Sequence, residues 1–276
     1  MKTYVLLVLS FISFSLASAQ SCCQLSSSRE FAMLSDNKSF VSSHLSPLPF
    51  HFVAERGSFI TFKAPDGKEG RAFEVKGKGN RFILMFHEWW GLNDYIQREA
   101  EKLQQQLGDV TVLAVDLYDG HVASSPEEAG KLMQSVDEKR ARSIIQGALE
   151  YAGPLAHIGT IGWCFGGGWS LQAAIMAGKQ GDACVMYYGM PETDTEKIKS
   201  LKAPVLGLFA QKDNWITPEK VNTFEKQMKE NGKEISIKFY DADHAFANPS
   251  NPKFNKEAGE DAYQKSVAFL KSKLLK

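Results

Sequence analysis

The sequence predicts an α/β fold with a mainly parallel central sheet and helices on both faces. Apolar runs of strand length alternate with segments of helical periodicity from about residue 56 onward, which is typical of parallel sheets with helical crossovers. The run RFILMF at 81–86 is continuously apolar, as expected for a central strand covered on both faces. The glycine-rich turn GWCFGGG at 162–168 joins a short strand directly to a helix.

The predicted elements follow one another through residues 56–276. Two strands flank the turn Pro65-Asp66-Gly67 and form an opening hairpin. Gly108 ends the first long helix, and Thr217 with Pro218 begins a later one. We expect strands at 58–63, 72–76, 81–86, 110–115, 157–161, 183–188, 204–209 and 235–240. We expect helices at 93–107, 137–151, 165–177, 218–231 and 257–275, with another helix start at Ser125-Pro126-Glu127.

The N-terminal residues predict export rather than a part of the core. Residues 1–19 contain one lysine, an apolar run and then Ala17-Ser18-Ala19, which is the layout of a cleaved signal peptide. The alternatives are an uncleaved membrane anchor and a lipid-modified Cys22, although Ala19-Gln20-Ser21 is a poor lipobox. We therefore expect a secreted or periplasmic protein. The serine-rich residues 20–55 lack periodicity and predict a tether or irregular arm.

Composition narrows the function classes. The chain has 32 basic and 32 acidic residues, which argues against nucleic-acid binding. The four cysteines, at 22, 23, 164 and 184, do not form a recognisable disulfide framework. The sequence shows no His/Cys cluster with metal-ligand spacing, so we expect neither a metal nor an organic cofactor. We expect a monomer acting on a small molecule.

Three reactive residues follow predicted strands. Cys164, Asp213 and His244 come after the strands ending at about 161, 210 and 240, and ligands bind at the carboxyl ends of such strands. Their order, nucleophile then acid then histidine, matches the α/β-hydrolases. Each residue also has a structural reading: a buried cysteine beside a nucleotide loop, a helix-terminal carboxylate and a surface histidine.

The choice of His244 and Asp213 rests partly on elimination. Among the other histidines, His44 and His51 precede the predicted domain, and His157 opens a strand. We expect Asp213 to hold one tautomer of the His244 imidazole. Asp241 and Asp243 are rivals for this role, but both lie close to His244 in the sequence.

Cys164 occupies the nucleophile position of a strand-to-helix elbow. Such an elbow needs glycines on both sides because neighbouring backbone comes close. The positive end of the following helix favours the thiolate form of the cysteine. We expect the backbone N–H groups of Phe165 and Trp89 to form the oxyanion hole.

The stretch HEWWGL after the central strand supplies the other wall of this site. Glu88 is an acid in an apolar setting, so burial should raise its pKa and a nearby cation should lower it. A surface carboxylate is the alternative. Trp89 and Trp90 could belong to the core, but a tandem pair on this loop favours a pocket wall.

The motifs HEWWGL, DLYDG, GWCFGGG, QKDNWITPE and DADHAF together resemble the dienelactone hydrolase family. The resemblance covers Arg56 to Lys276 and implies one α/β-hydrolase domain with a Cys164–His244–Asp213 triad. It also implies that Glu88 holds the resting thiol and helps to deprotonate it when substrate enters. Tyr118 and Tyr188 stand where the family has pocket tyrosines.

The sequence departs from the family at two substrate-binding positions. Enzymes that act on dienelactone carry two arginines that hold the substrate carboxylate. Gly120, in the segment Asp119-Gly120-His121, and Asn248 stand at those positions, and neither can replace a bidentate guanidinium. The pattern thus supports the catalytic residues better than it supports dienelactone as the substrate.

The sequence therefore predicts a cysteine-dependent hydrolase that cleaves a small ester or lactone through a thioester intermediate. A non-catalytic small-molecule-binding protein on the same fold is one alternative. A thiol redox protein is another, although the chain has no C-x-x-C motif.

Overall fold

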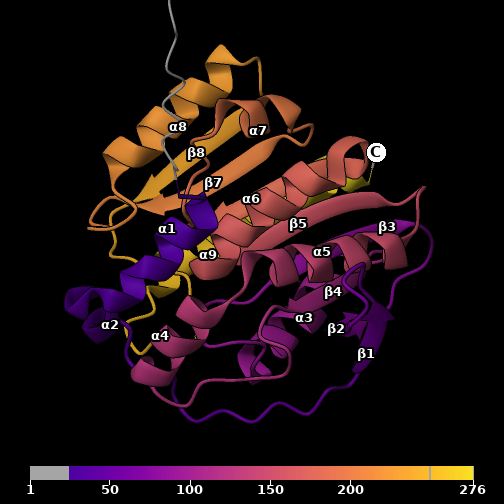
Figure 1. The fold of residues 1–276 in the computed structure, drawn as a ribbon, viewed down its shortest axis with the longest axis horizontal. Helices are drawn as coiled ribbons and strands as arrows, with labels where there is room; N and C mark the ends of the chain where they lie inside the picture. The colour runs from indigo at the N-terminus through magenta and orange to yellow at the C-terminus, as the bar shows by residue number, and fades with distance from the viewer. Residues whose placement is uncertain (1–24, 249, 276) are drawn as a thin grey trace, which may run out of the picture.

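The computed structural model describes residues 25–248 and 250–275, which form one eight-stranded sheet covered by helices (Figure 1). The strand order is β1-β2-β4-β3-β5-β6-β7-β8. β1 pairs with β2, and β2 with β4, antiparallel, while all later pairs are parallel. The strands are β1 (Gly57–Lys63), β2 (Glu69–Val75), β3 (Arg81–Phe86), β4 (Thr111–Asp116), β5 (His157–Trp163), β6 (Gly181–Tyr187), β7 (Val205–Ala210) and β8 (Ile235–Tyr240).

Helices cover both faces of this sheet. Side chains alternate along β5: Thr160 faces Ser170 of α6, whereas Gly159 lies against Leu274 of α9. α5 packs beside α6, and α3 packs beside α9. The helices are α3 (Asp94–Leu107), α4 (Pro126–Ser135), α5 (Glu138–Ala152), α6 (Phe165–Ala177), α7 (Thr195–Ser200), α8 (Pro218–Glu230) and α9 (Lys256–Leu274), with a short 3-10 turn η2 (Gly178–Gln180).

The predicted fold class is confirmed by this mainly parallel sheet and its two helical layers. Each predicted strand and helix is present, with ends that differ by a few residues. The apolar runs that predicted β3, β4 and β7 are buried. The short α7 was not predicted, because six residues capped by Asp194 are too few to show a helical period.

The segment expected to be a tether or irregular arm contains three short helices. These are α1 (Ser27–Ala32), η1 (Met33–Asp36) and α2 (Lys38–Ser43). Ser26 caps α1 and Asn37 caps α2 through their side-chain oxygens. We call residues 26–44 the N-terminal arm.

The N-terminal arm packs on the rest of the molecule between α6 and α4 (Figure 1). Phe31 and Phe40 of the arm are buried, with exposed fractions of 2% and 0%. These two rings and the caps hold the arm despite its lack of a periodic pattern. The expected signal peptide lies outside the described residues, and within those residues no helix is long and apolar enough to cross a membrane.

Candidate active site

The backbone at Cys164 forms a tight elbow between β5 and α6. Cys164 has a φ of 56°, in the left-handed region that non-glycine residues adopt at a cost of about 1–3 kcal/mol. A Cβ atom at Gly162 would lie 2.1 Å from the carbonyl oxygen of Gly166. The glycine spacing seen in the sequence is thus a steric requirement of this turn, which presents the Cys164 side chain at the carboxyl end of the sheet.

The structure brings together Cys164, His244 and Asp213, which lie far apart in the sequence. His244 Nε2 is 3.4 Å from Cys164 Sγ, and His244 Nδ1 is 2.5 Å from Asp213 Oδ2. The rival carboxylate Asp241 instead forms an exposed ion pair with Lys212. With these contacts, the Cys164 thiol can transfer its proton to His244 while the Asp213 carboxylate orients the imidazole.

Asp213 is held as a carboxylate by its surroundings. Burial acts to raise the pKa of Asp213, but the charge and hydrogen bond of His244, together with two backbone N–H groups, bring it below its usual value. The backbone N–H groups of Trp215 and Ile216 both donate to Asp213 Oδ1 at 2.9 Å. The carboxylate therefore has a fixed orientation toward His244.

The backbone N–H groups of Phe165 and Trp89 both hydrogen-bond to the Cys164 sulfur. Burial raises the pKa of the Cys164 thiol well above its usual value, and the Glu88 charge adds to this rise, while these two N–H groups lower it. The helix terminus was expected to favour the thiolate, whereas the family resemblance implied a resting thiol, and the raised pKa agrees with the latter. Burial outweighs the helix terminus, and Cys164 rests as a thiol.

Glu88 lies on the loop after β3 and is almost completely buried. Burial raises the pKa of Glu88 to about 8, although hydrogen bonds from Ser250 and Asn248 lower it. Ser250 Oγ donates to Glu88 Oε1 at 3.1 Å, and Asn248 Nδ2 donates to Glu88 Oε2. Glu88 therefore carries a proton at neutral pH. Because a protonated Glu88 has no charge, burial remains the main cause of the raised Cys164 pKa at neutral pH.

Ser250 was missed by the sequence analysis. It follows Asn248 by two residues, and this proximity to a family substrate-binding position is the signal that could have indicated it. Its position beside Glu88 depends on how the loop folds back onto β3, and the sequence does not indicate this.

The three predicted substrate-contacting aromatics lie in or near the site. Tyr188 packs against His244 with ring centroids 5.1 Å apart, and its hydroxyl is buried without a hydrogen-bond partner among the described residues. Tyr118 donates from its hydroxyl to the Trp89 carbonyl at 3.2 Å and thereby supports the oxyanion loop. Trp90 is buried against Trp89.

The N-terminal arm places His44 beside Cys164. His44 Nε2 is 3.8 Å from Cys164 Sγ, and His44 Nδ1 donates to the Phe40 carbonyl at 2.7 Å. Burial and the nearby His244 charge lower the pKa of His44 to about 3, so its imidazole is neutral. The ring centroid of Phe40 lies within 6 Å of those of Trp89, Trp215 and His244, edge-to-face with the two tryptophans and tilted against the imidazole.

His44 was excluded in the sequence analysis because it precedes the domain. A signal for it exists in hindsight. Asn37 begins a helical turn, and Phe40 and His44 are four residues apart, so both point to the same face. The high serine content of this stretch obscured that short pattern.

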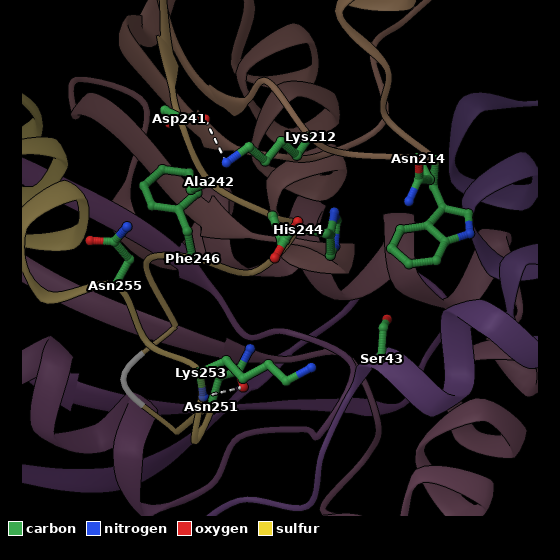
Figure 2. A pocket seen from close by; sticks show the side chains of 12 residues that line it. Ser43, Lys212, Asn214, Asp241, Ala242, His244, Phe246, Asn251, Lys253 and Asn255 are labelled. Carbon is green, nitrogen blue, oxygen red and sulfur yellow. Dashed lines mark hydrogen bonds and ion pairs between the residues drawn. The ribbon is translucent and has the colours of Figure 1, made fainter.

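A cavity of about 300 Å³ opens beside His244 (Figure 2). Ser43 at the end of α2 lies on one side, and Lys212 and Phe246 lie on others (Figure 2). The exposed fraction of Cys164 is only 1%. The cavity thus reaches the imidazole, while the arm and the elbow enclose the sulfur.

The two positions that carry arginine in dienelactone-cleaving enzymes have other contacts here. The backbone N–H of Gly120 donates to Asp116 at 2.8 Å. Asn248 hydrogen-bonds to Glu88, so Glu88 has a neutral partner where the family has a cation. The nearest cations that line the cavity are Lys212 and Lys253.

The sheet order, the elbow and the residues at the carboxyl ends of the strands define an α/β-hydrolase fold. The profile of the dienelactone hydrolase family matches residues 69–274. The chain therefore belongs to the dienelactone hydrolase family and is a hydrolase of that family.

Similar proteins agree with this assignment. The chain is 29% identical over 231 residues to "Protein usf" of Aquifex pyrophilus, covering 79% of this chain and 99% of that protein. It is 27% identical over 202 residues to carboxymethylenebutenolidase 1 of Cupriavidus pinatubonensis, covering 68% and 84%. A dienelactone hydrolase-like promiscuous phosphotriesterase from metagenomic libraries has the same fold, with a TM-score of 0.65, 18% identity and coverage of 79% and 99%.

Proposed function

We propose that this chain is a cysteine-dependent hydrolase of small esters or lactones that works through a thioester intermediate. The observation that carries the proposal is the set of contacts at Cys164 Sγ. One imidazole nitrogen lies 3.4 Å from the sulfur, and two backbone N–H groups hydrogen-bond to it. A nucleophile, a base and two oxyanion donors thus meet at one atom.

The first half of the reaction forms the thioester. His244 Nε2 takes the thiol proton, and the Cys164 sulfur attacks the carbonyl carbon of the ester or lactone. The carbonyl oxygen becomes an oxyanion held by the N–H groups of Phe165 and Trp89. When this intermediate collapses, the C–O bond breaks and the leaving alkoxide takes the proton from His244. Asp213 keeps the imidazole oriented throughout.

The second half restores the enzyme. His244 takes a proton from a water molecule, whose oxygen attacks the thioester carbonyl. Collapse breaks the C–S bond, and the proton on His244 returns to the sulfur. The carboxylic acid leaves. No oxidant or other reactant than water is needed.

Glu88 has a role in this proposal that follows from its pKa of about 8. A protonated Glu88 places no charge near the thiol and so does not oppose formation of the Cys164 thiolate. An ionised Glu88 would oppose it. We infer that hydrolysis is favoured by the protonated form of Glu88.

Access to the sulfur requires a change in the N-terminal arm. Phe40 and His44 pack over Cys164 and His244, and the sulfur is almost fully enclosed. The 300 Å³ cavity beside His244 is large enough for a small ester, but the acyl carbon must reach the sulfur. We propose that the arm shifts as substrate enters from this cavity.

Trapping the intermediate tests the proposal. Short-chain p-nitrophenyl esters and simple lactones are mixed with the full chain, quenched in acid and analysed by peptide mass spectrometry. We expect an acyl group on Cys164 and none on the other buried cysteine, Cys184. Ester turnover without any acyl-Cys164, in wild type and in a slowed Asp213→Asn variant, would contradict the thioester route.

The two alternatives from the sequence have less support. A binding protein on this fold has no need for a histidine and a carboxylate in register with the sulfur. A redox protein needs a resolving thiol, and Cys184, the other free cysteine of the described residues, contacts Ser170 rather than Cys164. We also propose that the protein acts outside the cytoplasm as a monomer, with residues 1–19 as its signal peptide.

A further inference from the structure

Cys164, His44 and His244 bring one sulfur and two imidazole nitrogens to one point. One ligand atom of each residue lies within 4.8 Å of the other two. Cys164 Sγ is 3.4 Å from His244 Nε2 and 3.8 Å from His44 Nε2. In a tetrahedral zinc site, bonds of about 2.3 Å to sulfur and about 2.0 Å to nitrogen place these atoms roughly 3.5 Å apart. The two observed sulfur–nitrogen distances differ from that value by only a few tenths of an ångström.

Each imidazole is also held in the way that zinc ligands are held. Metal-binding histidines usually donate from their second nitrogen to a carboxylate or a backbone carbonyl, which fixes the tautomer and the ring orientation. His244 Nδ1 contacts Asp213, and His44 Nδ1 donates to the carbonyl of Phe40. Both arrangements leave Nε2 as an acceptor that points toward the sulfur.

We propose that Cys164, His44 and His244 form a binding site for Zn²⁺. A thiolate and two imidazoles are borderline-soft ligands that suit Zn²⁺, whereas Mg²⁺ and Ca²⁺ prefer oxygen ligands. On binding, a zinc–sulfur bond replaces the sulfur–proton bond, and the proton leaves to solvent. The thiolate and the Asp213 carboxylate behind His244 then balance the two charges of the metal. A fourth position remains for a water molecule.

Zinc at this position would switch off thiol chemistry. The sulfur is then bound to the metal, and His244 Nε2 no longer accepts its proton. His44 comes from the N-terminal arm, so the metal also ties α2 to the elbow. The inference does not rest on the substrate class proposed above, because metal binding is measured without any ester.

Metal titration of the metal-free full chain tests the site. Zn²⁺ affinity is measured by competition with a chromogenic chelator, and Co²⁺ is used as a spectroscopic probe. We expect one ion per chain and a thiolate-to-Co²⁺ charge-transfer band. Alkylation of Cys164 should abolish both. Because changes to outer-shell partners alone cost about tenfold to a hundredfold in affinity, His44→Gln should weaken Zn²⁺ binding at least about a hundredfold.

The control variant is His51→Gln, which alters an exposed histidine of the neighbouring segment that pairs with Asp94. It should bind Zn²⁺ like the wild type. Zn²⁺ should slow iodoacetamide labelling of Cys164 in wild type and in His51→Gln, but not in His44→Gln.

Three results would overturn the proposal. They are the absence of a thiolate-to-Co²⁺ band in the wild type, unchanged Zn²⁺ affinity after Cys164 alkylation, or equal affinity in His44→Gln and His51→Gln. Near-ultraviolet circular dichroism confirms that each variant is folded. If His44→Gln does not fold, the band and the alkylation result on the wild-type chain still decide the question.

Discussion

The loops at the carboxyl end of the sheet differ from the N-terminal arm in how they reach the same site. The loops carry Cys164, Asp213 and His244 at positions that follow from the order of the strands. The arm carries Phe40 and His44, which no strand or long helix places there, and which contact the site only through packing. In the proposed mechanism the loops supply the groups that make and break bonds, and we expect the arm to control access to them.

The largest expected effect concerns the sulfur of Cys164, which the loops place at the centre of the site. Cys164→Ala should lower kcat/KM for a p-nitrophenyl ester at least about a thousandfold, because the nucleophile of such a unit carries most of its effect. Cys184→Ala, which removes the other buried thiol among residues 25–248 and 250–275, should change kcat/KM only slightly. Retained turnover in folded Cys164→Ala would contradict the assignment of Cys164 as the nucleophile.

The orientation of His244 is the next test. Asp213→Asn should lower kcat/KM by about a hundredfold to ten-thousandfold, since an amide cannot favour the required tautomer and imidazolium as a carboxylate does. The matched control is Asp182→Asn. Asp182 pairs with His157 at 2.7 Å at the other end of the sheet, outside the proposed site. An equal loss in both variants would show that Asp213 acts through stability rather than through His244.

The arm half of the comparison is tested by the accessibility of Cys164. Phe40→Ala removes the fully buried ring that anchors α2, a change that costs about 3–5 kcal/mol in a well-packed core. The freed arm should raise the rate of iodoacetamide labelling of Cys164 at least tenfold, measured by mass spectrometry below the melting temperature. Phe224→Ala truncates an equally buried ring in α8, away from the arm. It should not produce this increase, and equal labelling in both variants would remove the gating role.

The burial of Glu88 in the loop region should make the stability of the protein depend on pH. The pKa of Glu88 is raised from 4.5 to about 8 in the folded chain, so between these values the folded chain binds more protons than the unfolded chain. Stability therefore decreases as pH rises from about 4.5 to 8, by at most about 1.36 kcal/mol per pH unit from this group. Glu88→Gln should flatten that decrease in thermal melts. Asp213 has a lowered pKa, so it contributes stability that is lost as pH falls. Because its pKa lies below the usual value of 3.8, this loss occurs below the pH range in which Glu88 acts.

Glu88→Asp is a useful companion variant, because it keeps a titratable group while changing its reach to Ser250 and Asn248. It should retain a pH-dependent melting temperature. If Glu88→Gln shows the same slope as the wild type from pH 5 to 8, then Glu88 does not carry the proton assigned to it.

The smallest expected effect concerns substrate charge. Gly120 and Asn248 stand at the family's arginine positions, so a carboxylate-bearing dienelactone should gain less than about tenfold in kcat/KM over a neutral lactone of similar size. Lys212 and Lys253 line the cavity and could supply a residual preference. The variants Lys212→Ala and Lys253→Ala measure it, and His121→Ala serves as a control outside the cavity lining. A strong dienelactone preference that survives all three substitutions would show that the carboxylate is held elsewhere.

The fold class, the succession of strands and helices along the chain and the three residues that follow strands could all be predicted from the sequence. This was possible because buried strands have continuous apolar runs, and because parallel topology brings the ends of β5, β7 and β8 to one edge of the sheet. The elbow could also be predicted from its glycine spacing, because the neighbouring backbone lies too close for a Cβ atom at those positions.

The protonation of the sulfur and the placement of the arm depend on tertiary packing, which the sequence did not indicate. The pKa of Cys164 and that of Glu88 depend on how completely packing excludes water, and no sequence period records that. His44 reaches Cys164 across 120 residues of sequence by means of two buried phenylalanines and two helix caps. Contacts of this kind arise from the surface that the completed domain offers to the arm, so the helical pattern of the arm alone could not predict them.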